Sequence, residues 1–225
     1  MSVYAVSDLH GYLDNYYKIK KMLKPEDKVF CLGDCGDRGP DSWDTIKIVY
    51  QDPQFIYIKG NHEDMLVKAA REELGNSRSY QHRGVLQRNG GWGTLLEMFT
   101  EDDFEKWIDK IDKLPLYTTY KNEKEETLFL CHAGCTLDTS EIPSDEHLLW
   151  DRYHYLDNAK WQIYGIVVHG HTPIQHLADE IGDKATGESA YIYCKKKKVC
   201  IDAYTHKTGN TILFNLDTFE SILIQ

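Results

Sequence analysis

The sequence repeats one pattern along most of its length: a short apolar run leads directly into a polar loop that carries glycine with Asp, Asn or His. The apolar runs are residues 3–6, 29–32, 55–58, 128–130 and 166–168. A short apolar run bounded by glycine-rich turns is typical of a buried strand. Because ligand sites of parallel sheets form at the carboxyl ends of the strands, we expect these loops to converge on one site.

The loop at residues 33–39 reads Gly-Asp-Cys-Gly-Asp-Arg-Gly, and the rest of the chain is organised around it. It supplies two carboxylates and a guanidinium, which suit metal and phosphate, and its glycines let the backbone turn tightly and approach a ligand. Taken alone, the loop also fits an exposed acidic turn. The four similar loops elsewhere favour a functional site.

The first part of the chain alternates strands and helices. In chain order these elements are residues 2–6, 12–23, 28–32, 43–50, 55–59 and 63–74, with a strand first. This order predicts parallel strands joined by right-handed crossovers, with the chemistry at their carboxyl ends.

Two amphipathic helices follow at residues 92–98 and 104–111, and the chain then turns to strands. The predicted strands are residues 116–120, 127–131, 165–169, 190–194, 199–202, 211–215 and 221–224. Residues 145–153 predict a short helix or turn. We therefore expect an α/β (α+β) fold with two sheets packed as a sandwich, helices outside, and residues 1–225 as a single domain.

Two polar segments interrupt this pattern. Residues 75–91 are predicted to be a long loop, either disordered or a substrate rim whose arginines bind an anionic ligand. The arginines in or beside it are Arg71, Arg78, Arg83 and Arg88. Residues 195–198 are four lysines between two strands, which indicates a solvated hairpin turn.

The net charge of −10 and the pI of about 5.4 argue against a partner that is a nucleic-acid polymer or an anionic membrane. No apolar N-terminal segment or bilayer-length run is present, so we expect a cytoplasmic protein with reduced thiols. A structural zinc held by the spaced thiols is the minor alternative. Those thiols are Cys31, Cys35, Cys131 and Cys135.

The polar residues at the strand ends form a candidate ligand set for two divalent ions, Mn²⁺, Fe²⁺ or Zn²⁺. The set is Asp8, His10, Asp34, Asn61, His132 and His171. Asp34 is the natural bridging ligand because its loop is central. The spacing alone does not choose between His169 and His171, and we favour His171 because it lies past the strand.

Two ions close together bind phosphoryl oxygens, acidify a shared water into hydroxide and stabilise charge at phosphorus. His62 can protonate the leaving alkoxide while Asp37 orients it. Arg38 and Arg152 can bind phosphate oxygens, and Asn61 is expected to contact both metal and substrate.

Each assignment has a structural alternative. A histidine at a strand end is often a satisfied polar residue, and Arg152 could pair with Asp151 or Glu146. We interpret the remaining histidines as structural. These are His82, His147, His154, His176 and His206.

The five loops together resemble the motifs of calcineurin-like metallophosphoesterases of the phosphoprotein-phosphatase type. The matching segments are residues 7–11 (Ser-Asp-Leu-His-Gly), 33–39, 60–63 (Gly-Asn-His-Glu), 132–134 (His-Ala-Gly) and 170–172 (Gly-His-Thr). Residues 150–152 (Trp-Asp-Arg) and the size of the chain are similar to the short phage and bacterial serine/threonine phosphatases.

This resemblance implies a first metal on Asp8, His10 and Asp34. It implies a second metal that shares Asp34, with the remaining ligands from the set above. Ser7 and Gly36 depart from the family pattern, and we expect neither to touch a ligand. Gly36 could loosen the loop that holds Asp37.

We therefore expect a phosphatase acting on phosphoserine or phosphothreonine in proteins. The alternative within the family is a hydrolase of dinucleoside polyphosphates such as diadenosine tetraphosphate, and a third hypothesis is a non-catalytic phosphate-binding scaffold. The sequence leaves the oligomeric state open.

Overall fold

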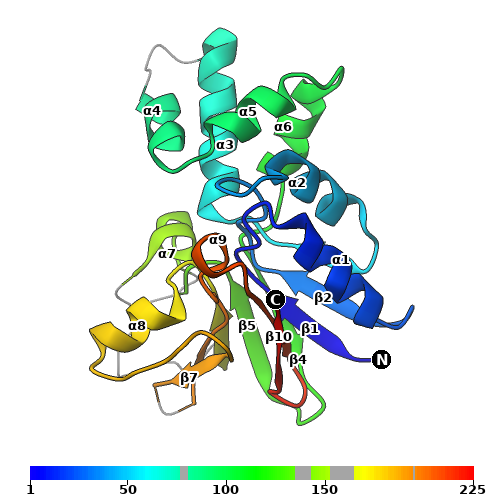
Figure 1. Ribbon diagram of the computed structural model, residues 1–225, viewed down its shortest axis with the longest axis vertical. Helices are drawn as coiled ribbons and strands as arrows, with labels where there is room; N and C mark the ends of the chain where they lie inside the picture. The colour runs from blue at the N-terminus through cyan, green and yellow to red at the C-terminus, as the bar shows by residue number, and fades with distance from the viewer. Residues whose placement is uncertain (77–80, 135–142, 153–164, 195) are drawn as a thin grey trace.

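The computed structural model describes residues 1–76, 81–134, 143–152, 165–194 and 196–225. Within these ranges the strands form two five-stranded sheets, with helices flanking them (Figure 1). The predicted fold class, α/β with two sheets and flanking helices, is confirmed.

The first sheet holds both ends of the described chain. Its strands, in spatial order, are β10 (Ser221–Ile224), β9 (Thr211–Asn215), β1 (Val3–Val6), β2 (Lys28–Cys31) and β3 (Phe55–Tyr57). The β1–β2 and β2–β3 pairs are parallel, as the alternating strands and helices predicted, and Val6 lies opposite Cys31. The loops after β1 and β2 therefore leave the sheet at the same edge.

The second sheet has a parallel centre. Its strands, in spatial order, are β4 (Tyr117–Lys121), β5 (Thr127–Cys131), β6 (Ile166–His169), β8 (Lys198–Cys200) and β7 (Tyr191–Tyr193). The β5–β6 and β6–β8 pairs are parallel, while β4 and β7 are antiparallel strands at the two edges. The loops after β5, β6 and β8 consequently share one edge of this sheet.

Helices cover the sheets and also form a group of their own. They are α1 (Leu13–Met22), α2 (Ser42–Gln51), α3 (Asn61–Arg71), η1 (Glu72–Asn76), α4 (Gln81–Arg88), α5 (Trp92–Met98), α6 (Phe104–Asp112), α7 (Asp145–Trp150), α8 (Ile174–Glu180) and α9 (Thr205–Thr208). Figure 1 shows α3, α4, α5 and α6 gathered at one end of the long axis, beyond the sheets.

Alternation along the strands divides the core into two main layers. Val3 and Ala5 on β1 face the layer between the two sheets, together with Leu130 and Val168 of the second sheet. Val6 faces the opposite layer, where α1, α2 and α3 pack. Because side chains alternate sides along a strand, each central strand of the first sheet contributes to both layers.

Residues 81–88 of the segment predicted as a long loop at residues 75–91 form helix α4, so the prediction is wrong for that stretch. The backbone N–H groups of His82 and Arg83 donate to the Glu72 carboxylate, with N–O distances of 3.3 and 2.8 Å. Leu86 is fully buried in the helix-side core. The cap comes from the preceding helix, and Leu86 with the partly buried Val85 anchors α4, so the local sequence gives little helical signal.

The four-lysine turn is also partly wrong. Lys196 and Lys197 are exposed, as predicted, but Lys198 belongs to β8 and is fully buried. Its strand lies between β6 and β7, so the neighbours on both sides cover it. Lys195 lies outside the described residues.

The described thiols do not form a common cluster. Cys31 and Cys35 lie together in the helix-side core, with their Sγ atoms 3.1 Å apart, while Cys131 packs in a separate cluster under α7. Cys135 lies outside the described residues. Among the residues described, no helix has both the length and the apolar character to cross a bilayer.

Candidate functional site

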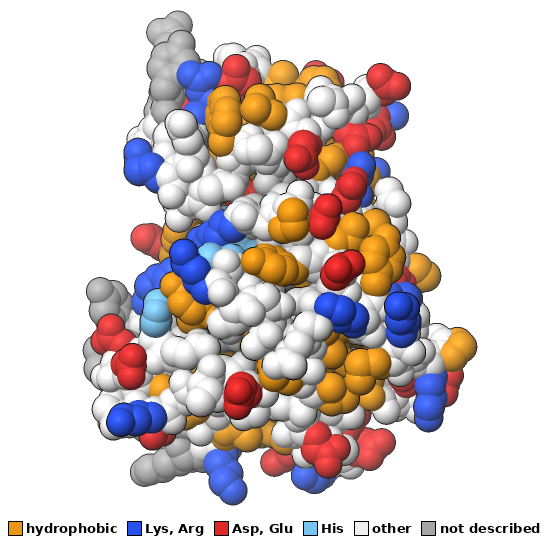
Figure 2. Space-filling view, viewed as in Figure 1, with side chains coloured by type: hydrophobic (Ala, Val, Ile, Leu, Met, Phe, Trp, Pro, Cys, Tyr) orange, Lys and Arg blue, Asp and Glu red, His pale blue; other side chains and the backbone are white. Residues whose placement is uncertain are grey.

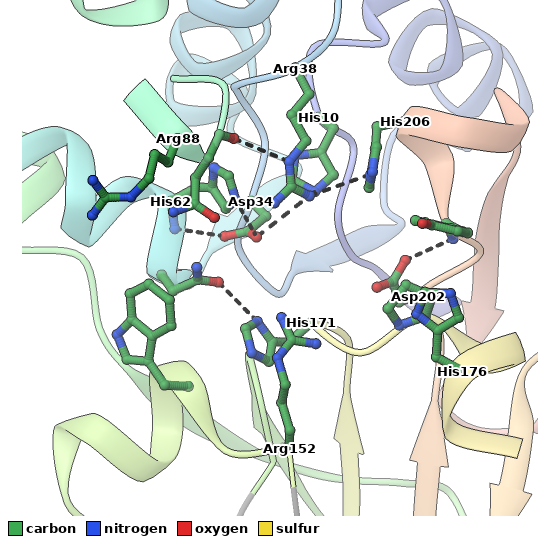
Figure 3. A pocket seen from close by; sticks show the side chains of 15 residues that line it. His10, Asp34, Arg38, His62, Arg88, Arg152, His171, His176, Asp202 and His206 are labelled. Atoms are coloured by element: carbon green, nitrogen blue, oxygen red, sulfur yellow. Dashed lines mark hydrogen bonds and ion pairs between the residues drawn. The ribbon is translucent and has the colours of Figure 1, made fainter. Parts of the chain in front are cut away.

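The strand-end loops of the two sheets meet, and Asp34 lies at their centre. Asp34 Oδ2 is 3.9 Å from His10 Nε2 and 3.8 Å from His62 Nε2. Asp34 Oδ1 lies on the other side, 3.4 Å from His132 Nε2. The two oxygens of one carboxylate therefore face different ring nitrogens. Figure 3 shows Asp34 between His10 and His62 on the one side and His171 on the other.

The remaining predicted ligands lie around this carboxylate. Asn61 Oδ1 is 2.8 Å from His132 Nε2 and 2.9 Å from His171 Nδ1. Asp8 Oδ1 is 3.8 Å from His10 Nε2, and Asp8 Oδ2 accepts a hydrogen bond from the His171 backbone N–H at 3.0 Å. The structure thus brings together all six residues of the predicted ligand set, each of them buried.

The donor atoms fit divalent cations. The ligand atoms of Asp34, His132 and His171 lie within 4.8 Å of one another, as do those of Asp34, His10 and His62. His171 Nε2 is buried without a hydrogen-bond partner in the described chain, so a polar atom is left for a ligand. Carboxylate and imidazole donors suit Mn²⁺, Fe²⁺ or Zn²⁺.

The carboxylate of Asp34 favours positive charge on the neighbouring His132 ring. Burial lowers the pKa of His132, but the charge of Asp34 outweighs burial and raises that pKa to about 10. Burial, followed by the charge of His132, lowers the pKa of His171 well below its usual value, so that ring is neutral. Neutral imidazole is the form that binds a metal.

The site loops are held in a strained backbone conformation. Six residues with side chains have positive φ angles here: Asp8 (54°), His10 (47°), Asp34 (56°), Asp37 (68°), Arg38 (70°) and His171 (65°). Residues other than glycine avoid this left-handed region, at a cost on the order of 1–3 kcal/mol each. Such outliers concentrate where side chains must be aimed at one point.

Glu63 ties two of these loops together. Its carboxylate accepts hydrogen bonds from the backbone N–H groups of Asp34, Cys35 and Gly60, at 2.8, 2.9 and 2.8 Å. Tyr57 Oη donates to the same carboxylate at 2.6 Å. Glu63 therefore fixes the position of Asp34, although the sequence showed it only as part of a motif.

His62 and Asp37 form a buried pair. His62 Nδ1 donates to Asp37 Oδ2 at 2.6 Å, and Thr94 Oγ1 donates to the other Asp37 oxygen at 2.6 Å. Burial lowers the pKa of His62, but the charge of Asp34 and the hydrogen bond to Asp37 outweigh burial, so the pKa is raised. His62 is thus held in one orientation with its Nε2 turned towards Asp34.

Arg38 reaches over the site from the central loop. Its Nη1 donates to His10 Nε2 at 2.8 Å, and its Nη2 lies 2.8 Å from His62 Nε2. Burial, together with the His62 charge, lowers the pKa of His10, which can therefore accept this hydrogen bond. The predicted phosphate-binding guanidinium lies directly above the candidate metal ligands (Figure 3).

A cavity of about 300 Å³ opens over these residues. Arg38, Arg88 and Arg152 line it, and Arg152 Nη1 is 3.5 Å from Thr172 Oγ1. In the space-filling view, Lys or Arg and His side chains gather at the level of the site, between the helical end and the sheets (Figure 2). An acidic protein thus carries local positive charge at its cavity.

Sequence reasoning missed several residues that line the cavity. His176 and His206 were taken as structural, but both face the cavity, as do Asp202 and Tyr204. His206 Nδ1 is 3.4 Å from Arg38 Nη1. Asp202 follows an apolar run at residues 199–201, so it repeats the strand-end pattern and could have been found from it.

The arginine rim is only partly present. Arg88 lines the cavity, whereas Arg71 and Arg83 pair with Asp112 and Glu73. Arg78 and His154 lie outside the described residues. His82 and His147 are not among the lining residues.

The choice between His169 and His171 is clear in the structure. His171 lines the cavity. His169 is fully buried in the sheet with its Nε2 2.7 Å from Tyr193 Oη, and burial lowers its pKa to about 3.

Both departures from the family pattern touch ligands, contrary to our expectation. Ser7 Oγ donates to Asp8 Oδ2 at 2.5 Å. His10 Nδ1 lies 3.0 Å from the Gly36 carbonyl oxygen, which accepts a hydrogen bond from it and leaves Nε2 for the site. The Ser7 hydroxyl and the backbone carbonyl of residue 36 each orient one member of the ligand set, but any residue at position 36 would supply that carbonyl.

Known proteins resemble this chain over most of its length. A family model for calcineurin-like phosphoesterases matches residues 1–207. The asymmetrical bis(5'-nucleosyl)-tetraphosphatase PrpE of Oceanobacillus iheyensis is 26% identical over 208 residues, covering 77% of this chain and 78% of its own. The symmetrical bis(5'-nucleosyl)-tetraphosphatase of Nitrosococcus oceani is 26% identical over 183 residues, covering 80% of this chain and 60% of its own.

Phosphatases are also similar. Serine/threonine-protein phosphatase 2 of Escherichia coli is 35% identical over 80 residues, covering 33% of this chain and 35% of its own. Among solved structures, a metallophosphoesterase from Sphaerobacter thermophilus has a TM-score of 0.60 at 14% identity, covering 99% of this chain and 86% of its own. A serine/threonine phosphatase from Saccharomyces cerevisiae has a TM-score of 0.59 at 14% identity, covering 99% and 78%. These structures share the fold.

Proposed function

Because the chain belongs to the calcineurin-like phosphoesterase family, we propose that it hydrolyses the phosphate monoesters phosphoserine and phosphothreonine in proteins. The proposed reaction uses two divalent ions, with Mn²⁺ as the preferred metal. The observation that carries this proposal is Asp34, whose two oxygens face separate groups of ring nitrogens. Asp8, His10 and Asp34 would hold one ion. Asp34 would share the other with the three remaining ligands, Asn61, His132 and His171.

When bound, such ions would supply Lewis acidity and a water of lowered pKa as the nucleophile. The side chains of this chain do the rest. Arg38 and Arg152 bind the phosphoryl oxygens, and Asn61, which lines the same cavity, contacts the same group in this proposal. His62 delivers a proton from Nε2 to the leaving oxygen, while Asp37 holds the ring through Nδ1.

Dinucleoside polyphosphates are the second candidate substrates. Arg88 places a third guanidinium at the cavity, opposite His176 and His206 in Figure 3, and it has no ion pair within the described chain. A polyphosphate chain offers a further anionic group for it, whereas one phosphoryl group is served by Arg38 and Arg152. The names of the Oceanobacillus and Nitrosococcus relatives point to the same substrate class.

Turnover of a phosphoserine peptide and of diadenosine tetraphosphate, each with Mn²⁺, tests the proposal in the wild type and three variants. The wild type is expected to hydrolyse the phosphopeptide. Asp34→Asn should lose most turnover on both substrates, whereas Asp44→Asn, an exposed carboxylate change on α2, should keep it. His62→Asn should lower phosphopeptide turnover by about 10²–10⁴-fold.

The same His62→Asn change should lower the turnover of diadenosine tetraphosphate less. A nucleotide phosphate can leave without being protonated, whereas a serine alkoxide needs a proton in order to leave. Equal losses on both substrates would refute the role of His62 as the acid. Undiminished turnover by Asp34→Asn would end the two-ion proposal. An inactive wild type that still binds Mn²⁺ would favour a phosphate-binding scaffold.

A further inference from the structure

A line of aromatic rings runs from the candidate metal ligands to the rim of the cavity. The His10 and His206 ring centroids are 5.2 Å apart, and those of His206 and Tyr204 are 4.8 Å apart. His176 completes the line, with its ring 4.9 Å from that of Tyr204. One ring, His206, therefore separates the Tyr204–His176 pair from a ligand of the proposed metal.

Tyr204 is held in this place against its backbone preference. Its φ of 66° lies in the left-handed region, which is strained for an aromatic residue. Its N–H donates to Asp202 Oδ1 at 2.8 Å, and its carbonyl accepts from the N–H groups of Lys207 and Thr208 at 2.9 and 3.0 Å. The neighbouring Thr205 is fully buried. These bonds hold the Tyr204 backbone, and the ring contacts with His176 and His206 place its side chain.

His176 offers ring surface to a ligand. It lies on α8, which begins just after the loop of His171, and its side chain is exposed. Its ring meets that of Tyr204 at 66°, edge against face. In such a pair each ring keeps at least one face uncovered by the other. His176 thus presents a flat apolar surface at the cavity, steadied by Tyr204.

From these contacts we infer that the Tyr204–His176 pair is a subsite for a planar ring, a nucleobase, joined to the phosphate that the metal site holds. Stacking on aromatic faces binds any base without reading its edges. Arg88, on the opposite side of the cavity in Figure 3, is left for an anionic group on the far side of the substrate. The inference rests on the proposed phosphoesterase function and favours the second candidate substrates, the dinucleoside polyphosphates, over phosphoproteins.

Binding of ADP and of pyrophosphate to the Mn²⁺-loaded protein, measured by calorimetry, tests this subsite. The two ligands share their phosphates, and only ADP carries a base. We expect ADP to bind the wild type at least tenfold more tightly than pyrophosphate. His176→Ala and Tyr204→Gly should each weaken ADP binding by about tenfold, with less than a twofold change for pyrophosphate.

Two matched variants control for indirect effects. Asp179→Ala changes an exposed residue of the same helix, and Glu125→Gly changes another left-handed residue, in the turn between β4 and β5. Both should leave the ratio of the two affinities as in the wild type. Tyr204→Gly should fold, because glycine accepts the left-handed backbone, and His176→Ala alone suffices if it does not.

Equal weakening of both ligands would mean that the pair only shapes the phosphate site, and this would overturn the inference. The same holds if neither variant changes ADP binding, or if the wild type does not prefer ADP. Failure of the proposed function gives a different result. A protein without esterase activity could still bind ADP more tightly than pyrophosphate as the wild type and lose this preference in the two variants. An active esterase with no ADP preference would keep the function and refute the subsite.

Discussion

Gly36 and Ile46 share one space at the base of the central loop. A Cβ atom added at Gly36 would lie 2.5 Å from Ile46 Cδ1 and 3.2 Å from the Ser42 carbonyl oxygen. Ile46 is buried, so its side chain has little room to move. A side chain from α2 therefore fills the volume that a branched residue at position 36 would occupy.

Gly36→Ala is accordingly expected to destabilise the protein by about 1–3 kcal/mol through overpacking. Ile46→Val removes the clashing Cδ1 atom, so the double variant should be more stable than the sum of the two single changes indicates. Urea unfolding of the four proteins measures this coupling. Gly93→Ala is the control, since no atom lies within 4 Å of its added Cβ. Additive free energies would contradict the shared-space account.

At the scale of elements, Asp52 joins α1 to the end of α2. Its Oδ2 accepts a hydrogen bond from Tyr16 Oη at 2.6 Å and lies 2.7 Å from Lys20 Nζ. Burial raises the pKa of Asp52, but the hydrogen bonds from Lys20 and Tyr16 outweigh it, so the pKa lies below its usual value of 3.8. The ionised form therefore stabilises the packing of the two helices.

This contribution should be fully present above the pKa of Asp52 in the unfolded chain and should disappear as pH falls through the lower, folded-state value. Asp52→Asn is expected to cost about 1–2 kcal/mol at pH 7 and progressively less as the medium becomes more acidic. Urea unfolding at several pH values measures it. Glu26→Gln, at an exposed carboxylate, should show no such trend. A cost independent of pH would exclude the ionised form as its source.

Most strands and the candidate metal-ligand set could be predicted from the sequence because both depend on a local pattern. Strand ends carry their own signal in apolar runs followed by Asp, Asn or His. Residues such as His176 and Tyr204 lack that signal, since they reach the cavity only through the packing of α8 and the loop after β8. Lys198 was misjudged for the same reason: neighbouring strands, rather than its own segment, decide that it is buried.

Across the whole molecule, the last two strands complete the first sheet. β9 pairs with β1 and with β10, and its alternating residues enter both core layers. Ile212 and Phe214 lie between the sheets, while Leu213 faces the helices, and all three are buried. The site residues all precede these strands, yet the sheet that carries Asp8 depends on them.

A chain that ends at Thr208 is therefore expected to lack a cooperative thermal transition, although it keeps every site residue. Losing several large buried side chains costs about 2–5 kcal/mol each, which together exceeds the roughly 5–15 kcal/mol that stabilises a domain. Calorimetry and near-ultraviolet circular dichroism report the outcome. Removing Gln225 alone, an exposed residue past β10, should change little. A cooperative transition in the shortened chain would show that β9 is dispensable.

The left-handed backbone conformation of Asp34 and its neighbours at the site limits how the thermal stability of this protein can be raised. Six residues with side chains hold a positive φ angle at the site, a backbone conformation that glycine adopts at lower energetic cost. Selection for heat resistance alone should therefore favour glycine at these positions, and each gain in melting temperature would remove a candidate ligand, a phosphate-binding side chain or the Asp37 partner of His62. Thermal stability and turnover therefore make opposite demands on the same few residues with positive φ angles.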